Sequence, residues 1–149
     1  MREALRLAQA SIGQGGGPFG AVVVRQGLLV AAGHNRVTLD QDPTAHAEVV
    51  AIRRACAVLG HFQLDDCDIY SSCEPCPMCL GAIYWARPRR LYVAATREDA
   101  AAAGFDDQFI YDEIARPPDA RHIPMQMLLR EEALHVFRLW QDRPDKQPY

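Results

Sequence analysis

The side chains best suited to chemistry lie in two short stretches, one around His46 and Glu48 and the other from Cys76 to Cys79. Zinc prefers imidazole nitrogen and thiolate sulfur, and a catalytic zinc site typically has three protein ligands and leaves the fourth position for water. His46, Cys76 and Cys79 supply that number of ligands. The two stretches therefore predict a zinc centre that activates a water molecule.

Glu48 is predicted to be a catalytic carboxylate and not a fourth ligand. It follows His46 by two residues, so on a helix its side chain does not lie on the same stripe as the ligand. Zinc lowers the pKa of a coordinated water to about 7, and a neighbouring carboxylate can take the proton and pass it to a substrate. This is general acid and base catalysis.

A zinc site that only stabilises a fold is the alternative to a catalytic site. A Cys-x-x-Cys pair with a distant histidine also occurs in structural sites, which are usually closed by a fourth ligand, and Cys73 is the candidate nearby. That alternative, a zinc-stapled binding module without activity, gives no role to Glu48 or to the prolines that flank Cys76. The catalytic interpretation is therefore favoured.

The composition predicts a single globular domain spanning residues 1–149, with 49% hydrophobic and 23% charged residues. No apolar run approaches the roughly 20 residues of a membrane span, and the first residues resemble an amphipathic helix more than a signal peptide. We therefore expect a cytoplasmic protein that does not bind membranes. Its five cysteines should be reduced, with Cys56 and Cys67 buried and outside the metal site.

The charge pattern argues against a nucleic-acid partner. The net charge is −3, and the only dense basic cluster lies between Arg87 and Arg90, close in sequence to several aspartates. A nucleic-acid surface normally carries a broad excess of Lys and Arg. A general nucleic-acid surface is therefore not indicated.

Apolar periodicity predicts alternating helices and strands, which position the two motifs. Glycine and proline breaks separate them. Helices are expected at 2–13, 45–59 with Thr44 as N-cap, 77–85, 100–103, 107–114 and 131–141, and strands at 21–24, 28–31, 69–71 and 91–94.

This order of elements predicts an α/β fold, a three-layer α/β/α sandwich in which the last two strands are parallel. Both ligand groups then lie at helix N-termini, where the helix dipole favours the thiolate form.

Four stretches of the chain carry a resemblance to a known group of enzymes. They are residues 16–21, 42–48, 72–86 and 104–107, and the pairing of His-x-Glu with Pro-Cys-x-x-Cys is typical of zinc-dependent nucleobase deaminases. The chain resembles the cytidine deaminase superfamily over nearly its whole length. The first three stretches are shared with tRNA adenosine deaminases, whereas residues 104–111 and the C-terminal tyrosine resemble small bacterial guanine deaminases.

The resemblance implies a specific activity and assembly. It implies zinc-dependent hydrolysis of guanine to xanthine and ammonia in purine catabolism, on a cytidine-deaminase-like fold with a mixed five-stranded sheet flanked by helices. It also implies a homodimer in which the C-terminal segments are exchanged, so that Tyr149 would cover the active site of the partner.

The chemistry of guanine gives a separate argument for two substrate contacts. Guanine has acceptors at O6 and N7, and donors at N1 and at its exocyclic amine. Asn35 can donate to an acceptor, and Asp107 can accept from the N1 and amine edge. Adenine would leave that carboxylate unpaired, at a cost of about 1 to 3 kcal/mol.

Other residues are expected to touch the substrate as well, with Phe19 as a stacking ring and Ala47 and Trp85 beside the base. Each assignment has a structural alternative, because Asn35 can cap a strand, Asp107 can cap a helix, and Phe19 can belong to the core. The sequence does not decide whether Asp106 or Asp107 faces the base.

Related deaminations remain open as alternatives. The substrate could be a tRNA adenosine, a cytosine compound or an aminotriazine. A tRNA substrate would require basic surface around the site, and the acidic balance of the chain argues against it.

Overall fold

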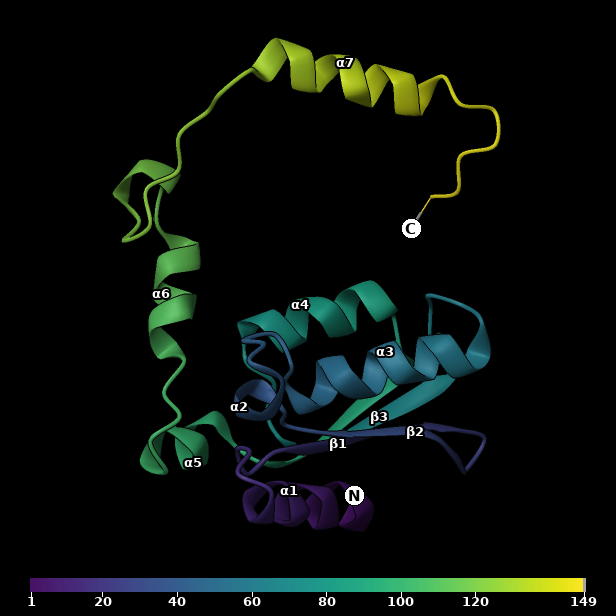
Figure 1. Cartoon of the computed structure of the whole chain (residues 1–149), viewed down its shortest axis with the longest axis vertical. Coiled ribbons are helices and arrows are strands. Elements are labelled where there is room, and N and C mark those ends of the chain that lie inside the picture. The colour runs from purple at the N-terminus through teal and green to yellow at the C-terminus, as the bar shows by residue number, and fades with distance from the viewer. Residues whose placement is uncertain (149) are drawn as a thin grey trace. The chain divides into compact units, whose positions relative to one another are not determined.

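A computed structural model describes residues 1–148, so Tyr149 lies outside the described residues. The chain divides into two compact units, Met1–Asp107 and Gln108–Tyr149, and each is described by itself. The first unit contains α1 (Arg2–Gly13), β1 (Gly20–Arg25), β2 (Leu28–His34), α2 (Val37–Asp40), α3 (Ala47–Leu59), β3 (Cys67–Cys73), α4 (Pro77–Ala86), β4 (Arg90–Ala95) and α5 (Arg97–Ala102), as Figure 1 shows.

The first unit is built on a mixed sheet with the strand order β2-β1-β3-β4. β1 runs antiparallel to β2 and β3, whereas β3 and β4 are parallel, which confirms the predicted parallel pair. The expectation of five strands is wrong for this structure, which has four. A strand needs a hydrogen-bonded neighbour, and among residues 96–148 no segment pairs with the free edge of β4.

Helices cover both faces of the sheet, which confirms the three-layer arrangement. Figure 1 shows α1 on one face and α3 with α4 on the other. Two glycines allow the helices to lie close to the strands. A Cβ on Gly20 would overlap the carbonyl oxygen of Ala4 in α1, and a Cβ on Gly33 would lie 2.5 Å from the carbonyl oxygen of Ala47 in α3.

The start of α3 differs from the prediction. The helix begins at Ala47 with His46 as N-cap, so the expectation that Thr44 caps it is wrong. The side chain of Asp42 explains the difference, because it accepts hydrogen bonds from the backbone N–H and the hydroxyl of Thr44 at 2.8 and 2.7 Å. This Asx turn keeps Thr44 outside the helix. The metal-binding candidate His46 is thereby placed at the helix end.

The start of α4 follows from its sequence. Cys76 is the N-cap, its sulfur accepts from the backbone N–H of Cys79 at 3.5 Å, and Pro77 occupies the first turn. Proline suits that position because its missing N–H would have no intrahelical partner. The prediction that both ligand groups lie at helix N-termini is confirmed.

The segment after β4 begins with α5, which starts three residues before the predicted helix at 100–103. Thr96 and Asp99 form a capping box, a signal that the sequence pattern contains but that apolar periodicity does not reveal. The short helix α2 also lies outside the helices expected from the sequence.

The second unit contains α6 (Gln108–Ala115), a 3₁₀ turn (Pro118–Ala120) and α7 (Arg130–Gln141). Both helices agree with the predicted ones within one residue at each end. No described residue of this unit is buried, and most apolar side chains of α7 are exposed, with Phe137 at 63% and Trp140 at 39%. In the part of the chain that the structure describes, no helix is long and apolar enough to cross a membrane.

Candidate active site

The three predicted metal ligands lie together. The ligand atoms of His46, Cys76 and Cys79 are all within 4.8 Å of one another, and the Nδ1 atom of His46 is 3.5 Å from the sulfur of Cys76. Zinc bonds of about 2.0 to 2.3 Å in a tetrahedron separate neighbouring ligand atoms by roughly 3.3 to 3.8 Å. The donor set and its spacing therefore fit zinc.

The two thiols and the imidazole already interact with each other. A hydrogen bond from the Cys79 thiol holds the pKa of Cys76 well below its usual value, and the same contact raises the pKa of Cys79. The hydrogen bond with Cys76 raises the pKa of His46 although burial opposes it. Metal binding would displace these protons, because cysteine coordinates as the thiolate and histidine as the neutral imidazole.

Glu48 lies beside the ligand group but is buried, with only 5% of the residue exposed. Its Oε1 atom accepts a hydrogen bond from the hydroxyl of Ser71 at 2.9 Å, and its Oε2 atom is 3.5 Å from the sulfur of Cys79. Burial raises the pKa of the Glu48 carboxyl. A carboxyl group that holds its proton more readily than in water can both accept and return a proton near neutral pH.

The remaining cysteines lie outside the metal group. Among the described residues the only cluster that could hold a metal is His46, Cys76 and Cys79. The thiol of Cys73, the candidate fourth ligand, donates instead to the carbonyl oxygen of Thr96 at 3.3 Å. All five cysteines are free of disulfides; Cys67 is buried as expected, whereas Cys56 is only partly buried. The geometry therefore favours a three-ligand site over a closed structural one.

Asn35 directly follows β2 and is buried, with 7% of the residue exposed. Its Oδ1 atom accepts from the backbone N–H groups of Gly17 and Val37 at 3.3 Å. The side-chain oxygen is thus occupied, and no bond from the amide nitrogen is found among residues 1–148. The nitrogen is the donor that the prediction assigned to the substrate.

The backbone around Asn35 is fixed by a residue that the sequence analysis did not identify. The buried hydroxyl of Ser11 in α1 donates to the carbonyl oxygen of Asn35 at 3.0 Å. Gly16 passes so close that an added Cβ would lie 2.5 Å from both of these oxygen atoms. A serine within an amphipathic helix carries no signal of such a role, so only the tertiary structure reveals it.

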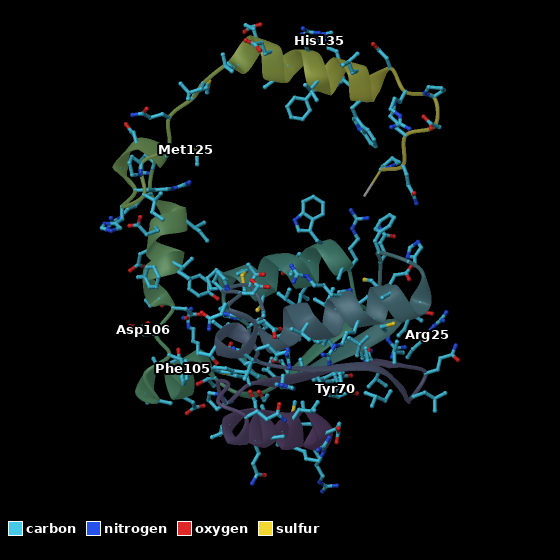
Figure 2. The ribbon with its side chains drawn as sticks, in the orientation of Figure 1. Arg25, Tyr70, Phe105, Asp106, Met125 and His135 are labelled. Atoms are coloured by element: carbon cyan, nitrogen blue, oxygen red, sulfur yellow. The ribbon has the colours of Figure 1, made fainter. Side chains whose placement is uncertain are left out.

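Asp107, one of the two candidate aspartates, interacts electrostatically with the ligand group. Burial and the charge on Cys76 raise the pKa of Asp107, and the Asp107 charge in turn favours protonated His46. Figure 2 shows Asp106 and Phe105 in the segment that follows α5. These interactions place the Asp107 carboxylate within electrostatic reach of the candidate metal site.

Phe19 and Phe105 meet edge to face, with ring centroids 5.0 Å apart and an interplanar angle of 84°. Phe19 also packs against the buried core. The ring is therefore partly a core residue, as the structural alternative stated, although it is not fully buried. Its contact with Phe105 joins the loop before β1 to the segment that carries Asp107.

The other three predicted substrate contacts have different environments. Ala47 is fully buried in the first turn of α3, where backbone N–H groups have no intrahelical acceptor. Trp85 is 61% exposed on α4, and its predicted position beside a base remains a prediction. Tyr149 lies outside the described residues, so its predicted role as a lid also remains a prediction.

Comparison with known proteins adds an independent line of observation. Residues 1–95 match the family described as the cytidine and deoxycytidylate deaminase zinc-binding region. The chain is 55% identical to a guanine deaminase from Bacillus subtilis (strain 168), in an alignment that covers 100% of this chain and 96% of that protein. It is 49% identical to a tRNA-specific adenosine deaminase from Agrobacterium fabrum, over 81% of this chain and 78% of that one.

A solved structure is similar over the same extent. The X-ray structure of guanine deaminase from Bacillus subtilis superposes with a TM-score of 0.96 and 55% sequence identity, and the match covers 99% of this chain and 95% of that one. The similarity therefore includes the residues beyond position 95, where the family match ends.

Proposed function

The chain belongs to the cytidine and deoxycytidylate deaminase family, and from that premise we propose that it hydrolyses guanine to xanthine and ammonia. The observation that carries the proposal is the buried carboxylate of Glu48 beside a three-ligand group. The similarity to guanine deaminase extends over the full chain, whereas that to the tRNA adenosine deaminase covers less of it. Guanine is therefore the preferred substrate.

We propose zinc as the resident metal, held by His46, Cys76 and Cys79. The donor set supports zinc, because thiolates combined with imidazole exclude the hard cations that prefer oxygen ligands. When bound in such a site, zinc lowers the pKa of water and so supplies a nucleophile near neutral pH. Three protein ligands leave room for that water.

Glu48 carries the protons in the proposed reaction. Water adds to C2 of guanine, and the carboxylate takes the proton that the water loses and delivers it to a ring nitrogen. Glu48 then takes the proton of the hydroxyl now on C2 and passes it to the amine; the C2–N bond breaks, ammonia leaves and the C2 carbonyl of xanthine forms. The raised pKa of the buried carboxyl supports both directions of transfer.

Asn35 and Asp107 are proposed to select the base. The amide nitrogen of Asn35 donates to an acceptor of guanine, and the carboxylate of Asp107 accepts from N1 and from the exocyclic amine. The backbone N–H of Ala47 and the rings of Phe19 and Trp85 complete the proposed contacts. Adenine has an acceptor at N1, which would face the carboxylate without a hydrogen bond.

Ammonia release from a panel of guanine, adenine, cytosine, cytidine and adenosine tests the proposal, with bound zinc measured on the same preparation. Guanine is expected to be the preferred substrate by a factor of about 10 or more, from the cost of an unpaired carboxylate. If the enzyme turns over another compound faster than guanine, that compound and not guanine is the preferred substrate. Full zinc loading without ammonia from any compound would favour the non-catalytic binding module.

Two related substrates stay in the test as alternatives. Aminotriazines share the amidine edge of guanine and are included as side substrates. A tRNA anticodon stem-loop containing adenosine is included because of the similarity to the tRNA-specific enzyme. The net charge of −3 argues against that substrate.

We also propose that the protein is a homodimer with exchanged C-terminal segments, and that Tyr149 covers the site of the partner. The exposed apolar side chains of the second unit support a partner, with Ile123, Met127 and Leu129 each at least 70% exposed. Light scattering of the purified protein tests the assembly, and a monomer at micromolar concentration would contradict it. Two further expectations remain predictions from the sequence: that the protein is cytoplasmic and that it acts in purine catabolism.

A further inference from the structure

A buried serine on the central strand contacts the catalytic carboxylate. Ser71 lies on β3, paired with Ala21 on one side and Val93 on the other, and only 2% of it is exposed. Its hydroxyl donates to the Oε1 atom of Glu48 at 2.9 Å. Hydrogen bonds to an ionised carboxylate in a buried site are among the stronger ones in proteins.

The two oxygens of Glu48 therefore have different neighbours. Oε1 is held by Ser71 on the sheet, whereas Oε2 lies 3.5 Å from the sulfur of Cys79 in the ligand group. A carboxylate at the start of a helix can rotate about its side-chain bonds, and one fixed oxygen restricts where the other points. The sheet thus determines which oxygen faces the reaction.

We propose that Ser71 is a positioning residue that holds Oε1 of Glu48, so that Oε2 is the atom that exchanges protons with the water and the substrate. The inference rests on the proposed function and extends it to a residue outside both sequence motifs. With Oε1 held by the hydroxyl of Ser71, Oε2 is the carboxylate oxygen turned toward the ligand group.

The main test compares Ser71→Ala and Ser71→Thr with the wild-type enzyme. Loss of the hydroxyl is expected to lower kcat about 10-fold, because one hydrogen bond that orients the base disappears. The KM for guanine, competitive inhibition by xanthine and the zinc content per chain should stay unchanged. Ser71→Thr keeps a hydroxyl on the same carbon and should recover most of the lost kcat.

Ser72→Ala is the matched control. Ser72 is the next residue of β3, is also buried, and its hydroxyl accepts from the backbone N–H of Gly20 at 3.0 Å. Because strand residues alternate between faces, its side chain points away from that of Ser71. This variant is expected to lower the unfolding temperature and to leave kcat unchanged.

A double-mutant comparison separates positioning from a general effect on the fold. In a Glu48→Gln background, Ser71→Ala should cause no further loss of kcat, because the hydroxyl acts through the carboxylate. If Ser71→Ala does not fold, Ser71→Cys preserves the volume with a weaker donor and should give an intermediate kcat.

Three results would overturn the inference. They are wild-type kcat in Ser71→Ala, an equal loss in Ser72→Ala, or an additive loss in the Glu48→Gln background. A wild-type enzyme that does not deaminate guanine would instead reject the proposed function, so the two failures are distinguishable.

Discussion

The two units of the chain differ in what their apolar residues do. In Met1–Asp107 they form a core, in which Leu64 and Ile69 are fully buried between the sheet and α3. In Gln108–Tyr149 no described residue is buried, although α7 carries a clear apolar stripe. The sequence pattern of an amphipathic helix thus identifies the face that needs cover, but it does not identify what covers it.

The candidate site follows the same division. The first unit contains the three candidate metal ligands together with Glu48, Ser71 and Asn35. We expect chemistry and metal binding to depend on the first unit. The second unit should affect assembly and access to the site.

The largest expected effect tests whether chemistry resides in the first unit. Glu48→Gln should keep its zinc and its fold but lose turnover by about 10² to 10⁴, the range for a positioned proton-transfer group. Steady-state ammonia release and metal analysis measure both quantities. Cys79→Ala is the companion variant and should lose metal and activity together. Activity close to wild type in Glu48→Gln would remove the residue from its role.

The next effect tests how tightly the first unit is packed. Gly20→Ala places a Cβ against the carbonyl oxygen of Ala4, and we expect a loss of about 1 to 3 kcal/mol in the free energy of unfolding. Gly81→Ala in α4 is the control, since no atom lies within 4 Å of its added Cβ. That variant should be neutral or stabilised by about 0.5 to 1 kcal/mol. Equal stability of the two variants in urea would contradict the close approach of α1.

A smaller effect is expected from the end of the second unit. Removal of residues 145–149 should leave the zinc content and the unfolding of the first unit unchanged. It should lower kcat/KM by about 10-fold, because the proposed covering segment would no longer exclude bulk water from the site. Point replacement of Tyr149 by Phe and by Ala separates the ring from its hydroxyl. Unchanged turnover in the truncated protein would limit the second unit to assembly.

The smallest effect concerns His34 at the end of β2, whose Nε2 atom is buried with no partner among the described residues. Burial lowers the pKa of His34, the charges of Arg36 and Arg54 lower it further, and Asp40 partly opposes them. The unfolded chain therefore binds this proton at higher pH than the folded one. Stability should be unaffected above about pH 7 and should fall as pH drops through the unfolded value of about 6.5.

His34→Gln tests this pH dependence. The difference in urea midpoint between wild type and variant should change between pH 7.5 and pH 5.5, with wild type losing more. Parallel pH curves for the two proteins would show that His34 does not titrate differently in the folded state.

Local signals in the sequence predicted most of the first unit and the ligand group. Ligand type and spacing predicted that His46, Cys76 and Cys79 lie together, and short β-rich runs predicted β1 to β4 within a few residues. Ser11 and Ser71 were not predicted, because their partners are 24 and 23 residues away in the chain and the residue type alone carries no information about such contacts. The cap of α3 was misplaced for a local reason, since the Thr44 hydroxyl donates to the side chain of Asp42 and not to the helix.

Cys76 has two tasks that use the same sulfur atom. The sulfur is a candidate metal ligand. It also accepts a hydrogen bond from the backbone N–H of Cys79 and so caps the N-terminus of α4. Removal of the metal by a chelator should therefore weaken this cap. Amide hydrogen exchange at the start of α4 should then become faster. Metal binding would in this way make the first turn of α4 more rigid.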